Sequence, residues 1–62
     1  MTVADVERRL NDGLERSLEE RIVARNWLES YMKEKNISAE ELDDICFEDS
    51  TKIFDSIYGG VI

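Results

Sequence analysis

Residues 37–42 read Ile-Ser-Ala-Glu-Glu-Leu, and this stretch decides where the chain turns and a new helix begins. Ser38 and Glu41 have the spacing of a capping box, in which a hydroxyl and a carboxylate satisfy the free amides of a helix start. The first and last residues of the stretch, both large and apolar, have the spacing of a hydrophobic staple across that start. The pattern predicts a helix that begins at Ala39 and a preceding helix that ends near Asn36 in a left-handed conformation.

The chain before this turn carries apolar residues at helical spacing, from Val3 to Met32. Thr2 and Asp5 also have capping-box spacing, so the first helix is expected to begin near Val3. One continuous helix over residues 3–35 keeps these apolar residues on one side of its axis. Such a helix would be about 50 Å long at about 1.5 Å per residue, and it requires a partner helix along its length.

The alternative is a break in this first helix at Asn11-Asp12-Gly13. Ser17 and Glu20 would then cap a new helix, because they also have capping-box spacing. Glycine in a helix interior costs about 1 kcal/mol relative to alanine, which favours the break. We expect the continuous helix, in which Gly13 lies beside the apolar stripe and lets another backbone approach closely.

The segment after the turn at residues 36–38 is expected to form a second, shorter helix over residues 39–58. Gly59-Gly60 then ends this helix and leaves residues 59–62 as a tail. A kink near Glu48-Asp49-Ser50 is the alternative, since aspartate and serine favour helix caps over helix interiors. The helix has two apolar sides. One side carries Leu42, Ile45, Cys46, Ile53 and Ile57, and the other carries Phe47, Phe54 and Tyr58.

These patterns predict one all-α domain over residues 1–62, built as a helical hairpin from a long helix and a shorter one. Neither helix can bury both of its apolar sides against a single neighbour. We therefore expect two copies to associate into a homodimer whose core is a four-helix bundle.

The composition of the chain narrows the classes of function. The chain has 62 residues, one cysteine and no histidine, so it has neither a disulfide framework of its own nor the side chains of a Cys/His zinc site. It offers no paired nucleophile and base, and it is too short to enclose a substrate cleft of ordinary size. We expect a non-enzymatic protein that holds no cofactor and no metal ion.

The location of the protein is predicted from the same features. The N-terminus has neither the basic region nor the apolar core of a signal peptide. No apolar run approaches the roughly 20 residues that span a bilayer. We expect a cytoplasmic protein without a membrane partner, and a single cysteine fits a reducing compartment.

Charge is divided unevenly along the chain, whose net charge is −7. Residues 1–35 hold seven of the eight Lys and Arg residues, whereas residues 36–62 hold Lys52 alone against seven acidic residues. The surplus of acid opposes direct nucleic-acid binding, because phosphate neutralisation needs basic side chains. The predicted partner-binding surface comprises Glu40, Glu41, Asp43, Asp44, Glu48, Asp49 and Asp55.

Two interpretations of this acidic surface remain open. A solvated acidic face keeps a small protein soluble. Alternatively, the carboxylates stand where phosphates would, and the surface docks on a basic protein that processes nucleic acid. By analogy of size and charge, the latter describes a phage-type inhibitor or modulator of a host protein. Carboxylates also suit Ca²⁺ or Mg²⁺, but the chain lacks the residue order of an EF-hand loop, so we expect no metal site.

A second group of residues is predicted to lie at an oligomer or partner interface. Arg21 and Arg25 fall on the edge of the apolar face, where Arg25 is expected to pair with Glu48 or Asp49 across the hairpin. Their alternative role is to anchor a carboxylate of a partner. Cys46 is expected to be a small buried hydrophobe, because nothing nearby supplies a base. The aromatic members of the group are Trp27, Tyr31, Phe47, Phe54 and Tyr58.

Residues 33–42, followed by Ile53 and Ile57, resemble the helix-turn-helix of repressor-type DNA-binding proteins. In that family a polar residue opens the first motif helix and a leucine follows four positions later. The resemblance implies a degenerate DNA-binding regulator, which stands as an alternative beside a structural oligomerisation module. The chain departs from the family with Asp43 at a small-residue position, Phe47 at the usual glycine of the turn, and Asp49 and Asp55 beside Lys52 on the helix that would read DNA.

Overall fold

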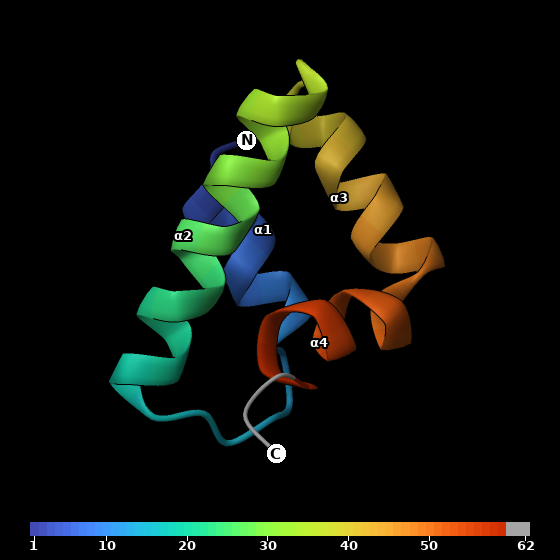
Figure 1. The fold of residues 1–62 in the computed structure, drawn as a ribbon. Coiled ribbons are helices and arrows are strands. Elements are labelled where there is room, and N and C mark those ends of the chain that lie inside the picture. Colours follow the sequence, from blue (N-terminus) through green and yellow to red (C-terminus); the bar gives the residue numbers. More distant parts are fainter. Residues whose placement is uncertain (60–62) are drawn as a thin grey trace.

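The computed structural model describes residues 1–59 and shows four α-helices in this part of the chain (Figure 1). The all-α prediction is confirmed. Helix α2 is the longest, α1 packs beside it, and α3 and α4 close the other side of the core. Residues 60–62 of the expected tail lie outside the described residues. The helices are α1 (Val3–Leu10), α2 (Leu18–Lys35), α3 (Ala39–Glu48) and α4 (Ser50–Tyr58).

Three of the helix starts are encoded by hydroxyl side chains. Thr2, Ser17 and Ser38 each accept a hydrogen bond from the backbone N–H three residues further on, at 3.3, 3.2 and 3.2 Å. At Thr2 and Ser17 the acidic residue at that third position accepts a bond from the N–H of the cap in return. At the other end of α2, Asn36 is left-handed with φ 54° and ψ 48°, as predicted. Short-range capping therefore places most of the helix boundaries.

The predicted continuous helix over residues 3–35 is wrong, and the alternative break is present. Gly13 has φ 78°, in the left-handed region that glycine adopts without strain, and Ser17 opens a new helix. The longest dimension of the protein is 29 Å, far below the length of such a continuous helix. The break allows α1 to fold back and bury Val6 in the core, which stabilises the fold. The apolar periodicity of residues 3–35 carries no information about this contact between distant segments.

The predicted continuous helix over residues 39–58 is also wrong, because the chain bends at Asp49 between α3 and α4. The Asp49 N–H still donates to the Ile45 carbonyl at 2.9 Å, while its own carbonyl accepts from the Ile53 N–H at 2.9 Å. One residue thus ends α3 and begins α4. The bend turns Ile53 and Ile57 onto the same core as the inner face of α3.

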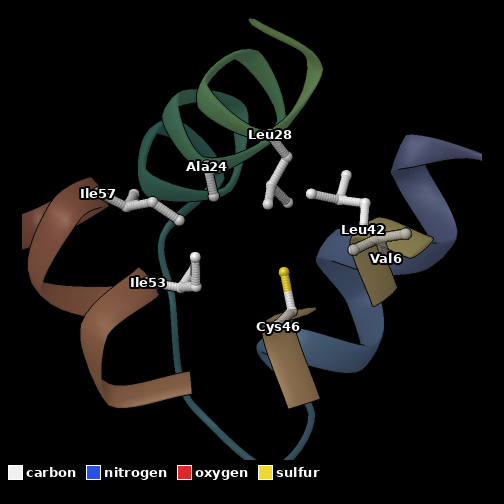
Figure 2. Packing of buried hydrophobic residues seen from close by; sticks show 7 residues of the cluster. All are labelled: Val6, Ala24, Leu28, Leu42, Cys46, Ile53 and Ile57. Carbon is white, nitrogen blue, oxygen red and sulfur yellow. The ribbon is translucent and has the colours of Figure 1, made fainter. Parts of the chain in front are cut away.

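The core draws on all four helices of a single chain (Figure 2). The apolar sides of α2 and α3, from which we predicted the hairpin and the dimeric four-helix bundle, are thereby largely covered within one chain. The described part of one chain contributes four helices to this core, where two were predicted. The buried apolar residues are Val6, Ala24, Leu28, Leu42, Cys46, Ile53 and Ile57.

Candidate functional site

The solvent side of α3 carries four exposed carboxylates that form one surface, the acidic face. Leu42 and Cys46 point into the core and Ala39, Asp43 and Ile45 are partly buried, so the other positions of α3 face water. Positions four apart lie close together on a helix, which places three of the carboxylates in one row along α3. No Lys or Arg occurs within α3. The acidic face consists of Glu40, Glu41, Asp44 and Glu48.

Two carboxylates of α3 have cationic partners. Asp43 turns towards α1 and lies 2.9 Å from Arg9, with only 15% of its side chain exposed, so it serves the fold rather than the acidic face. Glu40 lies 3.4 Å from the N-terminal amine. A hydrogen bond from its own backbone N–H and then the charge of that amine lower the pKa of Glu40, which keeps it ionised. Within residues 1–59, no ion pair involves Glu41, Asp44 or Glu48.

Part of the acidic face opposes the stability of its own helix. Glu40, Asp44 and Glu48 are separated by four residues each, and like charges at this spacing repel. The helix dipole favours Glu40 and Glu41 in the first turn of α3 and disfavours Glu48 in the last turn. The destabilising carboxylates are therefore Asp44 and Glu48.

Two further predicted acidic residues extend this negative surface beyond the bend. Asp49 and Asp55 line a shallow hollow of about 350 Å³ together with Glu48 and Lys52. Asp55 belongs to α4, so the bend at Asp49 is what places it near the end of α3. Six of the seven predicted acidic residues are therefore exposed, four on the acidic face and two at the bend.

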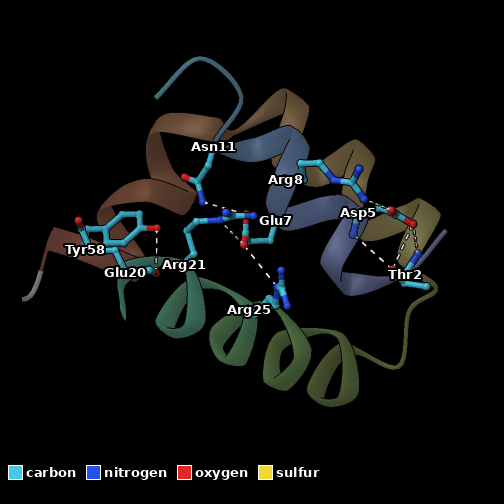
Figure 3. Close-up of polar contacts among 9 residues, drawn as sticks. All are labelled: Thr2, Asp5, Glu7, Arg8, Asn11, Glu20, Arg21, Arg25 and Tyr58. Carbon is cyan, nitrogen blue, oxygen red and sulfur yellow. Dashed lines mark hydrogen bonds and ion pairs between the residues drawn. The ribbon is translucent and has the colours of Figure 1, made fainter. Parts of the chain in front are cut away.

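A buried carboxylate, missed in the sequence analysis, binds the two predicted arginines (Figure 3). Glu7 is fully buried on α1, and its Oε1 lies 3.2 Å from Arg21 Nε and 3.4 Å from Arg25 Nε. Asn11 donates to the other oxygen at 3.4 Å. The arginines are thus paired structurally, but with α1 rather than with Glu48 or Asp49, because the predicted hairpin register required an unbroken first helix.

The sequence did contain a signal for the buried carboxylate. Glu7 lies four residues after Val3 and three before Leu10, which is a core position of the first apolar stripe. A carboxylate at such a position requires cations, since burying an unpaired charge is costly. The only way to supply them from Arg21 and Arg25 is to fold α1 back on α2.

Four of the predicted interface aromatics stack in pairs within the chain. Trp27 stacks on Tyr31 with ring centroids 5.1 Å apart, and Phe54 stacks on Tyr58 at 6.2 Å. All four are half-buried. The guanidinium of Arg16 lies 4.1 Å from the centre of the Tyr58 ring, a cation–π contact that ties α4 to the loop before α2.

Tyr58 also donates a hydrogen bond from its hydroxyl to the Glu20 carbonyl at 3.4 Å (Figure 3). Phe47, by contrast, remains 84% exposed. The predicted strip of Phe47, Phe54 and Tyr58 does not form, because the bend between α3 and α4 turns the latter two rings towards α2.

Cys46 is buried in the core, as predicted. Burial, followed by the nearby Asp43 carboxylate, raises the pKa of the Cys46 thiol to about 11. The thiol is therefore protonated at neutral pH and is a poor nucleophile.

A second exposed surface lies at the start of α2 and consists of apolar side chains. Leu18 is 72% exposed. Leu14 in the preceding loop and Ile22 and Val23 about one turn further along α2 are each about half exposed. Charges of both signs, from Glu19 and Arg25, surround it. This α2 patch comprises Leu14, Leu18, Ile22 and Val23.

Comparison with known protein families, with characterised proteins and with solved structures finds no match to the chain. Within the described part of the chain, no His, Cys, Asp and Glu side chains gather in a group able to hold a metal ion. Among its four helices, none has the length and apolar character needed to cross a membrane.

Proposed function

We propose that the protein is a non-enzymatic regulator that binds a partner protein carrying a basic surface. The acidic face of α3 is the observation that carries this proposal. Glu41, Asp44 and Glu48 have no cationic partner among residues 1–59, and Asp44 and Glu48 repel each other across one helical turn. A basic partner would neutralise them and convert that repulsion into attraction.

The class of partner follows from the geometry of the face. Carboxylates four residues apart on a helix are spaced by about 6 Å along its axis, so they form a line of negative charge. A basic groove that holds a nucleic-acid backbone is complementary to such a line. The protein would then inhibit or modulate a nucleic-acid-processing protein by occupying its binding groove.

The test uses affinity capture from a bacterial lysate, followed by competition. The captured partner is purified, and its binding to labelled nucleic acid is measured with and without this protein. We expect displacement of the nucleic acid and a steep loss of binding between low and high salt. Asp44→Asn/Glu48→Gln should lose capture and displacement together.

The matched control is Glu19→Gln/Glu29→Gln, which removes the same charge from exposed positions of α2. It should capture the same partner as the parent chain. Equal capture by both double variants, or a partner that leaves its nucleic acid bound, would contradict the proposal.

A second candidate function, self-association, is favoured by the α2 patch. It exposes four apolar side chains, so a second copy of the same patch would cover the same residues on both chains. In this case the chain is a structural module and the homodimer forms through α2. Sedimentation equilibrium should then show dimers that Leu18→Glu dissociates, whereas a monomer at high micromolar concentration excludes this candidate.

A further inference from the structure

Phe47 has the most exposed of the large apolar side chains that the structure describes. Elsewhere the chain covers its aromatic rings, as Phe54 does by stacking on Tyr58. Burial of a phenylalanine ring is among the largest apolar contributions that a residue makes to folding, and Phe47 forgoes it. Contacts within the chain therefore give no reason for a large apolar side chain at position 47.

Phe47 borders a groove between α1 and α3, the Phe47 groove. Its volume is about 590 Å³, within the range of sites that accept a small group. Leu10 and Cys46 supply further apolar surface, so one side of the groove belongs to each helix. The other lining residues are Arg8, Arg9, Asp12, Asp43 and Ser50.

Both guanidiniums that line the Phe47 groove have carboxylate partners. Arg9 lies 2.9 Å from Asp43, and Arg8 lies 2.8 Å from Asp5. Asp12 is the one lining carboxylate without an ion pair among residues 1–59. An apolar side chain that entered the groove would lose no charge hydration and would gain contact with Leu10 and Phe47.

The groove adjoins the acidic face. At about 100° per residue, Phe47 lies within about 20° of Glu40 and about 60° of Asp44 around the α3 axis. All three side chains are exposed. A ligand that reaches one surface therefore also reaches the other.

We infer that the partner docks through a short basic protein segment that carries one apolar anchor residue. The anchor occupies the Phe47 groove and contacts Phe47, while Lys or Arg residues beside it bind Asp44 and Glu48. This inference rests on the proposed function and adds to it the chemistry of the docking segment. Charge complementarity with the acidic face selects the basic residues, and the exposed Phe47 ring beside Leu10 selects the apolar one.

The test uses two fluorescein-labelled peptides with four lysines each, placed around a central leucine in one and a central serine in the other. Fluorescence anisotropy measures the dissociation constant of each for the full chain. We expect the leucine peptide to bind about tenfold more tightly, as burial of one aliphatic side chain provides. Phe47→Ala should abolish that ratio, and the control Leu18→Ala on the α2 patch should preserve it.

The outcomes separate the inference from the proposed function. Equal binding of the two peptides, with both weakened by Asp44→Asn/Glu48→Gln, would overturn the apolar anchor and leave the acidic face as the binding surface. A leucine preference that survives Phe47→Ala would also overturn the inference, because the anchor would then lie elsewhere. Absence of binding by either peptide at low salt would overturn both proposals. Circular dichroism of each variant confirms that its helices are intact.

Discussion

Carboxylates have opposite surroundings in two regions of the molecule, which are the contact between α1 and α2 and the outer side of α3. On α1, Glu7 is fully buried, and two arginines and an asparagine surround it within 3.4 Å. On α3, Asp44 and Glu48 lie in water without an ion pair among the described residues. The first region uses charge to hold two helices together, whereas the second leaves its charge exposed to solvent.

The difference shows that net charge alone does not locate a function. Residues 1–35 hold seven cations against eight acidic residues, and Arg21 and Arg25 pair with Glu7 inside the fold. In α3, Asp43 and Glu40 have cationic partners, whereas Glu41, Asp44 and Glu48 have none among the described residues. Substitutions can therefore alter the two groups of charges separately.

The largest effect is expected where the buried carboxylate loses its cations. Arg21→Met/Arg25→Met leaves Glu7 buried and unpaired, which costs about 3–5 kcal/mol. A chain of this size has only a few kcal/mol of stability, so the double variant should be largely unfolded at 25 °C. Urea titration followed by circular dichroism measures the loss.

Two further variants identify the cause. Glu7→Leu added to the same chain removes the unpaired charge and should restore folding. Lys33→Met/Lys35→Met removes two exposed cations from the same helix and should change stability by less than about 1 kcal/mol. A native-like midpoint for Arg21→Met/Arg25→Met would show that the charge cluster does not hold α1 on α2.

The next effect concerns the inner side of α3, where burial rather than charge decides reactivity. With the pKa of Cys46 raised from 9.0 to about 11, the thiolate fraction at pH 8 falls about a hundredfold below that of a free thiol. Labelling by a thiol reagent should be slow in buffer and fast in urea. Rapid labelling of the folded chain would contradict the buried position of Cys46.

The same shift predicts a dependence of stability on pH. The folded state holds the Cys46 proton more tightly than the unfolded state, so this contribution is complete below pH 9.0 and disappears as the pH rises towards about 11. Unfolding midpoints measured across that range should fall. Cys46→Val should make the decline smaller.

The smallest effect distinguishes the outer side of α3 from an ordinary solvated surface. Asp44→Asn/Glu48→Gln removes like-charge repulsion and should raise the free energy of unfolding by about 0.3–1 kcal/mol. Glu19→Gln/Glu29→Gln should not, since Glu19 lies in the favourable first turn of α2 and Glu29 pairs with Lys33. Chemical denaturation of the two variants gives the comparison. A destabilised α3 variant would remove the argument that the acidic face is kept at a cost to the fold.

Local features of the fold were predictable from the sequence, and long-range ones were not. The starts at Val3 and Ala39 and the left-handed Asn36 follow from residues within one turn of each boundary. The breaks at Gly13 and Asp49 were recognised as alternatives, but choosing them required the energy of packing α1 and α4 on the core. The apolar periodicity of one segment does not reveal the free energy of packing that segment on another helix.

The candidate site was predicted with similar limits. Exposure of Glu40, Glu41, Asp44 and Glu48 follows from their place opposite the apolar residues of one helix. The use of Asp43 by Arg9 depends on where α1 packs, and so does the pairing of Glu7. A sequence pattern assigns the wrong surroundings to residues whose partners lie on a helix that is distant in the sequence.

Helix α4 differs from the others at its first residue, because the side chain of its N-cap, Asp49, makes no capping hydrogen bond. Its first amides consequently depend on solvent, and Ile53, Ile57 and the contacts of Tyr58 hold it on the rest of the fold. In hydrogen–deuterium exchange, we expect α4 to lose protection before α2 and α3. Helix α4 would then open while α2 and α3 stay paired, which gives the described part of the chain an order of local unfolding.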